Sequence, residues 1–319
     1  METERSFVAR VTAFRQATAL RQVTAGIGRF DVGVLRDAEH IPALITAVLF
    51  ILLFGQPLYT MAMDWWSSPE AGHGLLLAPV AIWLAWRQGV RAGATPNRVV
   101  GITVLVLAVA LRCAAGLAAE LFTMRASVII ALAGLTTYRY GVRQVLHWWL
   151  PFALASLAIP LPELVTQALA LPLQFRASRM GAALLRMRGV PVMLSGNVIR
   201  LPGHELFVTE ACSGLRSLTA LISVSVLMSA LVLRSVAGRI ALVLLAIPIA
   251  IVVNGFRVFM TGFLVFFVGP EFGKGFMHLT EGWLLFLVSM GALALVAWLG
   301  VALERRVAAW RTRGALADA

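Results

Sequence analysis

The chain has 319 residues, of which 60% are hydrophobic and only 13% are charged. A soluble domain is roughly half apolar and one quarter charged, so this composition excludes a soluble globular protein and indicates an integral membrane protein. The net charge of +12 comes from arginines in short segments between apolar runs, a pattern typical of helix orientation in a membrane rather than of nucleic-acid binding.

Eight apolar segments are predicted to be transmembrane helices, because about 20 residues of helix cross the hydrocarbon core. The predicted fold class is therefore an all-α polytopic membrane protein. The first apolar run starts near Ile41, after an arginine-rich tail, and is expected to act as an uncleaved anchor. The predicted spans are 41–63, 74–87, 99–118, 121–138, 144–159, 211–233, 239–257 and 282–303.

The distribution of arginine predicts the orientation of these spans. If both termini are cytoplasmic, the short outer loops are nearly free of positive charge, as the positive-inside rule requires. This topology makes residues 1–40 and 304–319 cytoplasmic tails around a transmembrane domain of residues 41–303. The inner segments then hold the arginines of the amino-terminal tail together with Arg87, Arg91, Arg98, Arg139, Arg143, Arg234, Arg239, Arg305, Arg306, Arg311 and Arg313.

An extracytoplasmic insertion at residues 160–210 separates the fifth and sixth spans. Prolines at its start end the fifth span, because a proline ring clashes with a continuing helix. Residues 163–188 mix apolar and basic positions, which predicts an amphipathic helix on the membrane surface. Apolar residues then alternate around turn signals at 195–197 and 202–203, which predicts a small β-meander leading into Cys212.

Cys212 lies at the predicted amino-terminus of the sixth span. A helix amino-terminus favours the reactive thiolate, and its backbone N–H groups can receive an oxyanion. Gly214 allows close approach by a substrate backbone. A small buried hydrophobe is the alternative interpretation, and the nearby carboxylate of Glu210 disfavours the thiolate.

Arg257 interrupts an apolar run near the end of the seventh span. An arginine at the bilayer centre costs about 2.5–3.5 kcal/mol. Its position, about 25 Å along the helix at 1.5 Å per residue, places it near the outer interface. A fixed cation that holds a substrate carbonyl or carboxylate is the functional interpretation, with Asn254 bracing it; snorkelling or a structural ion pair is the alternative.

His278 precedes the eighth span on the outer side and is suited to carry protons near neutral pH. A polar anchor at the interface is the alternative, and Glu281 fits a helix cap. His73, in the first outer loop behind two tryptophans, is a weaker candidate because capping or interface anchoring explains it. Together Cys212, Arg257 and His278 supply a nucleophile, a cation and a proton carrier, the minimum for acyl transfer.

Motifs in this order resemble those of the exosortase/archaeosortase family of membrane transpeptidases. The string Glu-Ala-Cys-Ser-Gly-Leu-Arg-Ser-Leu at 210–218 is similar to the cysteine motif of the family, and Asn-Gly-Phe-Arg-Val at 254–258 to its arginine motif. His278, followed by Gly-Trp, resembles its histidine motif. Residues 66–79, with His-Gly inside, resemble its first outer loop and second span. The resemblance runs from the first span to the eighth.

The resemblance implies an enzyme that cleaves C-terminal sorting signals of secreted proteins at the outer face of the bacterial inner membrane. Such a signal has a short motif, often Pro-Glu-Pro (PEP-CTERM), then a transmembrane helix and a basic cluster. Cys212, Arg257 and His278 are expected to be catalytic through a thioester whose acyl group passes to an acceptor. Residues expected to bind substrate or support the site are Ser213, Gly214, Arg216, Asn254, His73 and Glu281.

Two other functions stay open. An intramembrane cysteine protease would use the same residues with water as the acceptor. A transporter or a polysaccharide-assembly component would carry polar groups at the bilayer midplane, often in repeated halves. No cofactor and no metal are expected, because the histidines lack metal-ligand spacing. The expected partners are the sorting-signal helix, an acceptor that the sequence does not identify, and the lipid bilayer, with no nucleic acid.

Overall fold

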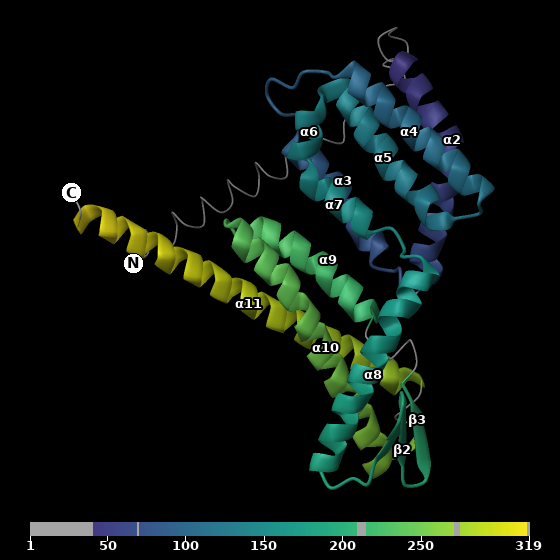
Figure 1. The fold of residues 1–319 in the computed structure, drawn as a ribbon, viewed down its shortest axis with the longest axis vertical. Coiled ribbons are helices and arrows are strands. Elements are labelled where there is room, and N and C mark those ends of the chain that lie inside the picture. The colour runs from purple at the N-terminus through teal and green to yellow at the C-terminus, as the bar shows by residue number, and fades with distance from the viewer. Residues whose placement is uncertain (1–40, 69, 209–214, 271–274, 318–319) are drawn as a thin grey trace, which may run out of the picture. The chain divides into compact units, whose positions relative to one another are not determined.

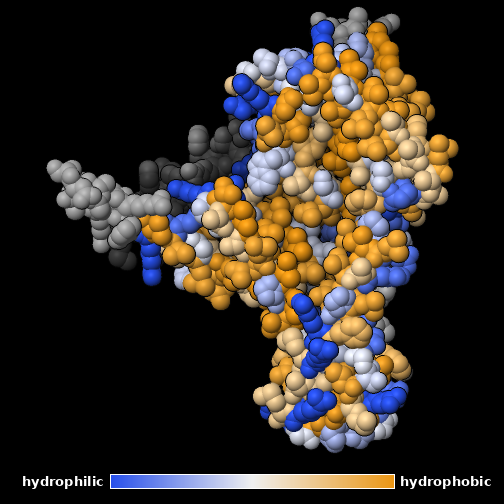
Figure 2. All heavy atoms as spheres, viewed as in Figure 1, coloured by the Kyte–Doolittle hydropathy of each residue, from blue (hydrophilic) through white to orange (hydrophobic). Residues whose placement is uncertain are grey.

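The computed structural model describes residues 41–68, 70–208, 215–270 and 275–317, and their side chains except at 275–282 and 309–317 (Figure 1). The chain forms two units: the first ends at Leu53, and the second comprises residues 54–319. Figure 2 shows that hydrophobic residues cover much of the visible helix surface, as expected for a protein surrounded by lipid.

Within the described ranges, six helices are long and apolar enough to cross a membrane. The prediction of an all-α polytopic membrane protein is thereby confirmed. These helices are α2 (Ile41–Ser67), α4 (Arg98–Leu117), α5 (Leu121–Tyr140), α9 (Leu215–Val232), α10 (Val236–Phe267) and α11 (Gly275–Ala317). The apolar stretch of α11 covers Trp283–Ala308, and the helix continues through the segment after residue 303.

The second and fifth predicted spans correspond to shorter helices. α3 (Gly74–Gln88) has 15 residues, or about 22 Å of helix. The fifth predicted span is divided at Trp148 into α6 (Val142–His147) and α7 (Trp149–Leu157). α3 and α7 pack against each other and against α9 in one buried cluster, whose fully buried members are Leu77, Ala81, Leu84, Leu150, Leu154 and Ala158.

The end of α3 is joined to α6 by a buried glutamine. The side-chain carbonyl of Gln144 accepts a hydrogen bond from Arg91 N at 2.8 Å, and its amide donates to Gly89 O at 3.2 Å. Trp148 Nε1 also donates to Gly89 O, at 3.1 Å. These side chains satisfy backbone groups that the end of a helix leaves without intrahelical partners. The break at Trp148 thus coincides with a contact between α6 and the end of α3, which hydropathy does not predict.

α10 continues beyond the predicted end of the seventh span. Its 32 residues give about 48 Å of helix, whereas the hydrocarbon core is about 30 Å thick. Hydropathy alone leaves the course of residues 258–268 open, and the structure shows that the helix runs to Phe267. The carboxyl-terminal part of α10 shares a buried core with α8 (Glu163–Met187) and the strands, formed by Ala177, Leu185, Val190, Ile199, Leu201, Val208, Val258 and Val265.

The predicted β-meander is present between α8 and residue 208. β1 (Met193–Ser195), β2 (Val198–Leu201) and β3 (His204–Phe207) form an antiparallel sheet in chain order. The turns contain Gly196 and Gly203, whose φ angles of +64° and +79° favour glycine. Alternate residues of β2 face the core, which explains the period-2 pattern in the sequence.

Candidate active site

Arg257 and Asn254 line a small pocket between α9, α10 and α11. The two residues are one helical turn apart and therefore share a face of α10. Asn254 is buried, and Thr261, one turn further, donates from Oγ1 to the Arg257 carbonyl at 3.0 Å. The other lining residues are Ser217 of α9, Ala250 and Val253 of α10, and Leu285, Phe286 and Ser289 of α11.

A different face of α10 packs against α8. A Cβ atom added at Gly255 would lie 2.8 Å from Met180 Cβ, and one added at Gly181 would lie 2.6 Å from Val258 Cγ1. Small residues on both helices therefore allow their backbones to approach closely. This packing leaves the face with Asn254 and Arg257 directed to α9 and α11, so Arg257 lines a pocket that combines polar and apolar side chains.

The pocket lies close to an exposed tryptophan. Trp283 is 66% exposed at the start of the apolar stretch of α11, and the pocket residues Leu285 and Phe286 follow within one turn. Tryptophan concentrates where hydrocarbon meets the polar head groups. The position of Trp283 thus indicates that the pocket lies near a membrane–water boundary rather than at the bilayer midplane.

The loop after α2 reaches the start of α9. Arg216 Nη2 donates to Glu70 Oε1 at 3.4 Å, and Ser68 Oγ donates to Glu70 Oε2 at 3.1 Å. Partial burial raises the pKa of Glu70, but hydrogen bonds from the backbone, Ser68 and Arg216 outweigh it, so the pKa lies below its usual value. The loop is therefore connected to the helix whose amino-terminal side carries the cysteine motif.

His73 fixes the same loop to the end of α7. Its Nδ1 lies 3.1 Å from Glu70 O, and its Nε2 lies 3.1 Å from Leu157 O. Trp65 Nε1 donates to the next carbonyl, Ala158 O, at 2.7 Å. Both carbonyls belong to a helix end where no further helical N–H follows. The described residues that line the Arg257 pocket do not include His73. The structure therefore supports a role for His73 in the contact between the loop and α7.

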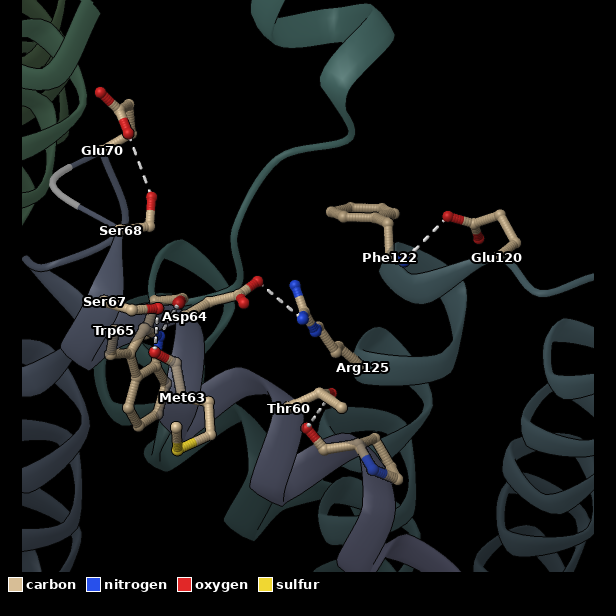
Figure 3. Close-up of polar contacts among 12 residues, drawn as sticks. Thr60, Met63, Asp64, Trp65, Ser67, Ser68, Glu70, Glu120, Phe122 and Arg125 are labelled. Atoms are coloured by element: carbon tan, nitrogen blue, oxygen red, sulfur yellow. Dashed lines mark hydrogen bonds and ion pairs between the residues drawn. The ribbon is translucent and has the colours of Figure 1, made fainter.

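An ion pair between the buried Arg125 and the half-exposed Asp64, which the sequence analysis did not predict, joins α2 and α5. Arg125 is only 4% exposed, and its Nη2 lies 2.7 Å from Asp64 Oδ2, with the two side chains directed toward each other (Figure 3). The sequence contained a signal, because Arg125 interrupts an apolar span and Asp64 lies near the end of another. Opposite charges at matching depths of neighbouring spans are expected to pair.

Several predicted site residues lie beyond what the structure describes. Cys212, Ser213 and Gly214 are outside the described residues. His278 and Glu281 belong to the first turns of α11, and their side chains are outside the described part. The structure thus brings Asn254 and Arg257 together and connects Arg216 to the first loop. It adds Ser217 and Ser289 as pocket residues, and neither stood out in the sequence because serine is common in membrane helices.

The family model described as Transmembrane exosortase (Exosortase_EpsH) matches residues 65–295, well over half of the chain. This chain belongs to the transmembrane exosortase family. The exosortase is accordingly a multi-pass membrane protein of a family that processes the sorting signals of secreted proteins. The match begins at Trp65, so most of α2 lies outside the matched part. No curated protein and no solved structure matches the exosortase chain significantly.

Proposed function

We propose that this exosortase cleaves C-terminal sorting signals at the outer face of the bacterial inner membrane and transfers the new C-terminus to an acceptor. The observation that carries the proposal is the Arg257 pocket, because it is lined by the helices to which the three motifs belong. α9 begins three residues after Cys212, α10 carries Arg257, and α11 carries His278. A nucleophile, a cation and a proton carrier brought together by adjacent helices are suited to acyl transfer.

Helical geometry supports the inclusion of His278. Leu285 and Ser289 line the pocket, and they follow position 278 by 7 and 11 residues. With about 3.6 residues per turn, these separations are close to two and three full turns. This periodicity supports a position for His278 on the side of α11 that faces the pocket, nearer to the helix start.

The proposed reaction has two acyl-transfer steps. The Cys212 thiolate attacks the scissile carbonyl, and the Arg257 guanidinium stabilises the oxyanion together with N–H groups near the start of α9. His278 gives a proton to the departing amine, which leaves a thioester on Cys212 and releases the signal helix. The nucleophilic group of the acceptor then loses a proton to His278 and attacks the thioester, which releases the thiolate and completes the new bond.

The contacts between helix ends support the predicted division of the loops between two sides of the membrane, although the orientation itself rests on the arginine count. The pairs Trp65–Ala158, His73–Leu157 and Glu70–Arg216 each join ends that are predicted to be outside. The hydrogen bond from Asn97 N to Thr137 O and the contacts of Gln144 with Arg91 and Gly89 join ends that are predicted to be inside. This segregation agrees with an active site on the outer side, where the arginine count also places the cysteine and histidine motifs.

The proposal is tested by co-expression with a secreted protein that ends in a sorting-signal helix. Cys212→Ala and His278→Ala are expected to accumulate in the membrane at normal levels and to leave this substrate uncleaved. The matched control is Cys113→Ala, an exposed cysteine of α4, which is expected to cleave normally. Normal processing by the Cys212→Ala protein refutes the assignment. Mass spectrometry of the product then identifies the acceptor, since water leaves a free carboxylate and an amine adds its own mass.

A further inference from the structure

The exposed surface of α8 changes in polarity from one end of the helix to the other, rather than from one face to the opposite face. The exposed side chains of its second half are mostly basic, whereas those of its first half are mostly apolar, and the change falls between Phe175 and Arg176. In the first half, the polar exceptions Gln167 and Glu163 are hydrogen-bonded to each other at 3.0 Å. The exposed apolar residues are Leu164, Val165, Leu169, Leu171 and Phe175, and the exposed arginines are Arg176, Arg179, Arg186 and Arg188.

The apolar side chains of this first half lie mostly outside the buried core of the protein. The buried face of α8 consists mainly of small residues, among them Ala170, Ala177, Gly181 and Ala182, and continues along the helix. Leu164, on the other side, is 84% exposed. A contiguous exposed apolar surface in a membrane protein is suited to contact with acyl chains.

The basic half of α8 lies at the level of the Arg257 pocket. Gly181 packs against Val258, and Met180 packs against Gly255, so this part of α8 is adjacent to the residues on both sides of Arg257. The blue side chains in the lower part of Figure 2 lie over this end of α8 and the strands. Within the described ranges, neither Arg176 nor Arg179 takes part in an ion pair with a carboxylate. Their charges therefore face outward at the depth where the exposed Trp283 indicates a membrane boundary.

We propose that residues 163–175 of α8 enter the acyl chains of the leaflet on the pocket side obliquely, and that Arg176 and Arg179 bind lipid phosphate groups. The 13 residues from Glu163 to Phe175 give about 20 Å of helix, and one leaflet has about 15 Å of hydrocarbon, so an inclined helix fits. The partner is the head group of an anionic phospholipid, because guanidinium donors match phosphate oxygens and the attraction grows with the surface charge of the bilayer. The proposal differs from a helix lying flat, since only the first half is immersed.

Cysteine labelling tests the immersion in the full chain, with Cys113→Ala and Cys212→Ala as background. Leu164→Cys and Leu171→Cys are each compared with Met187→Cys in proteoliposomes, with a membrane-impermeant maleimide added from the pocket side. Thiols in hydrocarbon stay protonated, so the first two variants are expected to react on the order of tenfold more slowly than the third, and to catch up in detergent. Equal rates in liposomes overturn the proposal. Slow labelling that persists in detergent also overturns it, because the surface is then covered by protein, such as a second copy of the chain.

Lipid binding is tested with the otherwise unaltered chain. Addition of phosphatidylglycerol to the detergent-purified protein is expected to raise its melting temperature, and Arg176→Gln with Arg179→Gln is expected to reduce this rise at least by half. The matched control is Arg200→Gln, an exposed arginine of β2 paired with Glu205, which is expected to keep the full rise. An unchanged rise in the double variant overturns the phosphate assignment. Neither measurement requires cleavage, so failure here is distinct from failure of the proposed transpeptidase activity.

Discussion

Glu70 and Arg216 are 146 positions apart in the sequence, and Arg216 Nη2 lies 3.4 Å from Glu70 Oε1. The contact joins the loop after α2, which is expected to be the first outer loop, to the second residue of α9. Arg216 follows Cys212 by four residues, so the start of this helix is attached to the end of α7 through Glu70 and His73. The first outer loop therefore restrains the helix that leads away from the proposed nucleophile.

Charge reversal tests this restraint. Glu70→Arg and Arg216→Glu are each expected to lower kcat/KM for signal cleavage by about two- to fivefold, the range for a solvent-accessible ion pair. The double variant restores the attraction and is expected to recover most of the loss. The same exchange at Arg200 and Glu205, an ion pair of the sheet, is expected to leave cleavage unchanged. If kcat/KM of the double variant is no higher than that of the less active single variant, the ion pair has no role in cleavage.

The lowered pKa of Glu70 predicts a pH dependence of stability. A carboxylate whose pKa is lower when folded stabilises the folded state above its ordinary value of 4.5, and this stabilisation is lost as pH falls through the folded pKa. Glu70→Gln is therefore expected to melt at a lower temperature than the native chain at neutral pH. The difference should shrink once the pH drops below about 4.5. Melting curves in detergent across this range measure it, and a constant difference contradicts the assignment.

Two replacements of Arg257 distinguish the contribution of its charge to catalysis from that of its planar guanidinium group. Arg257→Ala is expected to lower kcat on the order of 100- to 1,000-fold, the usual loss when one oxyanion donor is removed. Arg257→Lys keeps the charge but not the planar fork of donors, and it is expected to recover only part of the activity. The control is Arg139→Ala, in the last turn of α5. Arg139 does not line the pocket, so this variant is expected to retain activity. Full activity of Arg257→Ala would remove the guanidinium from the proposed mechanism.

Gly74 is predicted to be intolerant of a side chain. A Cβ atom there would overlap the indole of Trp65, whose hydrogen bond from Nε1 to Ala158 O would be disturbed. Gly74→Ala is expected to destabilise the protein by about 1–3 kcal/mol, the usual cost of overpacking. Gly291→Ala, at a helical glycine with no atom within 4 Å, is expected to be neutral or stabilising by roughly 0.5–1 kcal/mol. Thermal unfolding in detergent compares the two, and equal effects would argue against the steric explanation.

The Asp64–Arg125 ion pair should matter more than an exposed one. Asp64→Ala leaves the guanidinium of a 4%-exposed arginine without its carboxylate. Because Asp64 itself is 41% exposed, the expected cost is about 1–3 kcal/mol, the range for a buried donor left unsatisfied. Glu205→Ala removes the partner of the exposed Arg200 and is expected to cost less than about 1 kcal/mol. Comparison of urea midpoints in mixed micelles measures the difference. A similar loss of unfolding free energy in both variants would show that the contribution of Arg125 to stability does not depend on its burial.

The helical class was predictable because long apolar runs are a local property of the sequence, and the strands followed from alternation and turn glycines. The break at Trp148 was not, because it accompanies contacts with Gly89 on another helix. Asn254 and Arg257 were expected together, since they are one turn apart. Ser217 and Ser289 were not, because their shared pocket depends on how α9 and α11 pack around α10. The sequence therefore indicates which side chains share a face of one helix. Contacts between side chains of different helices depend on how the helices pack.

The uninterrupted course of α10 has a mechanical consequence. Arg257 and Val265 belong to the same continuous helix, one lining the pocket and the other buried with the strands. A helix of this kind transmits a push along its axis and offers no hinge between these two residues. A force that displaces the β-meander is therefore expected to reach Arg257 as well, so the strands and the pocket are joined by a rigid connection.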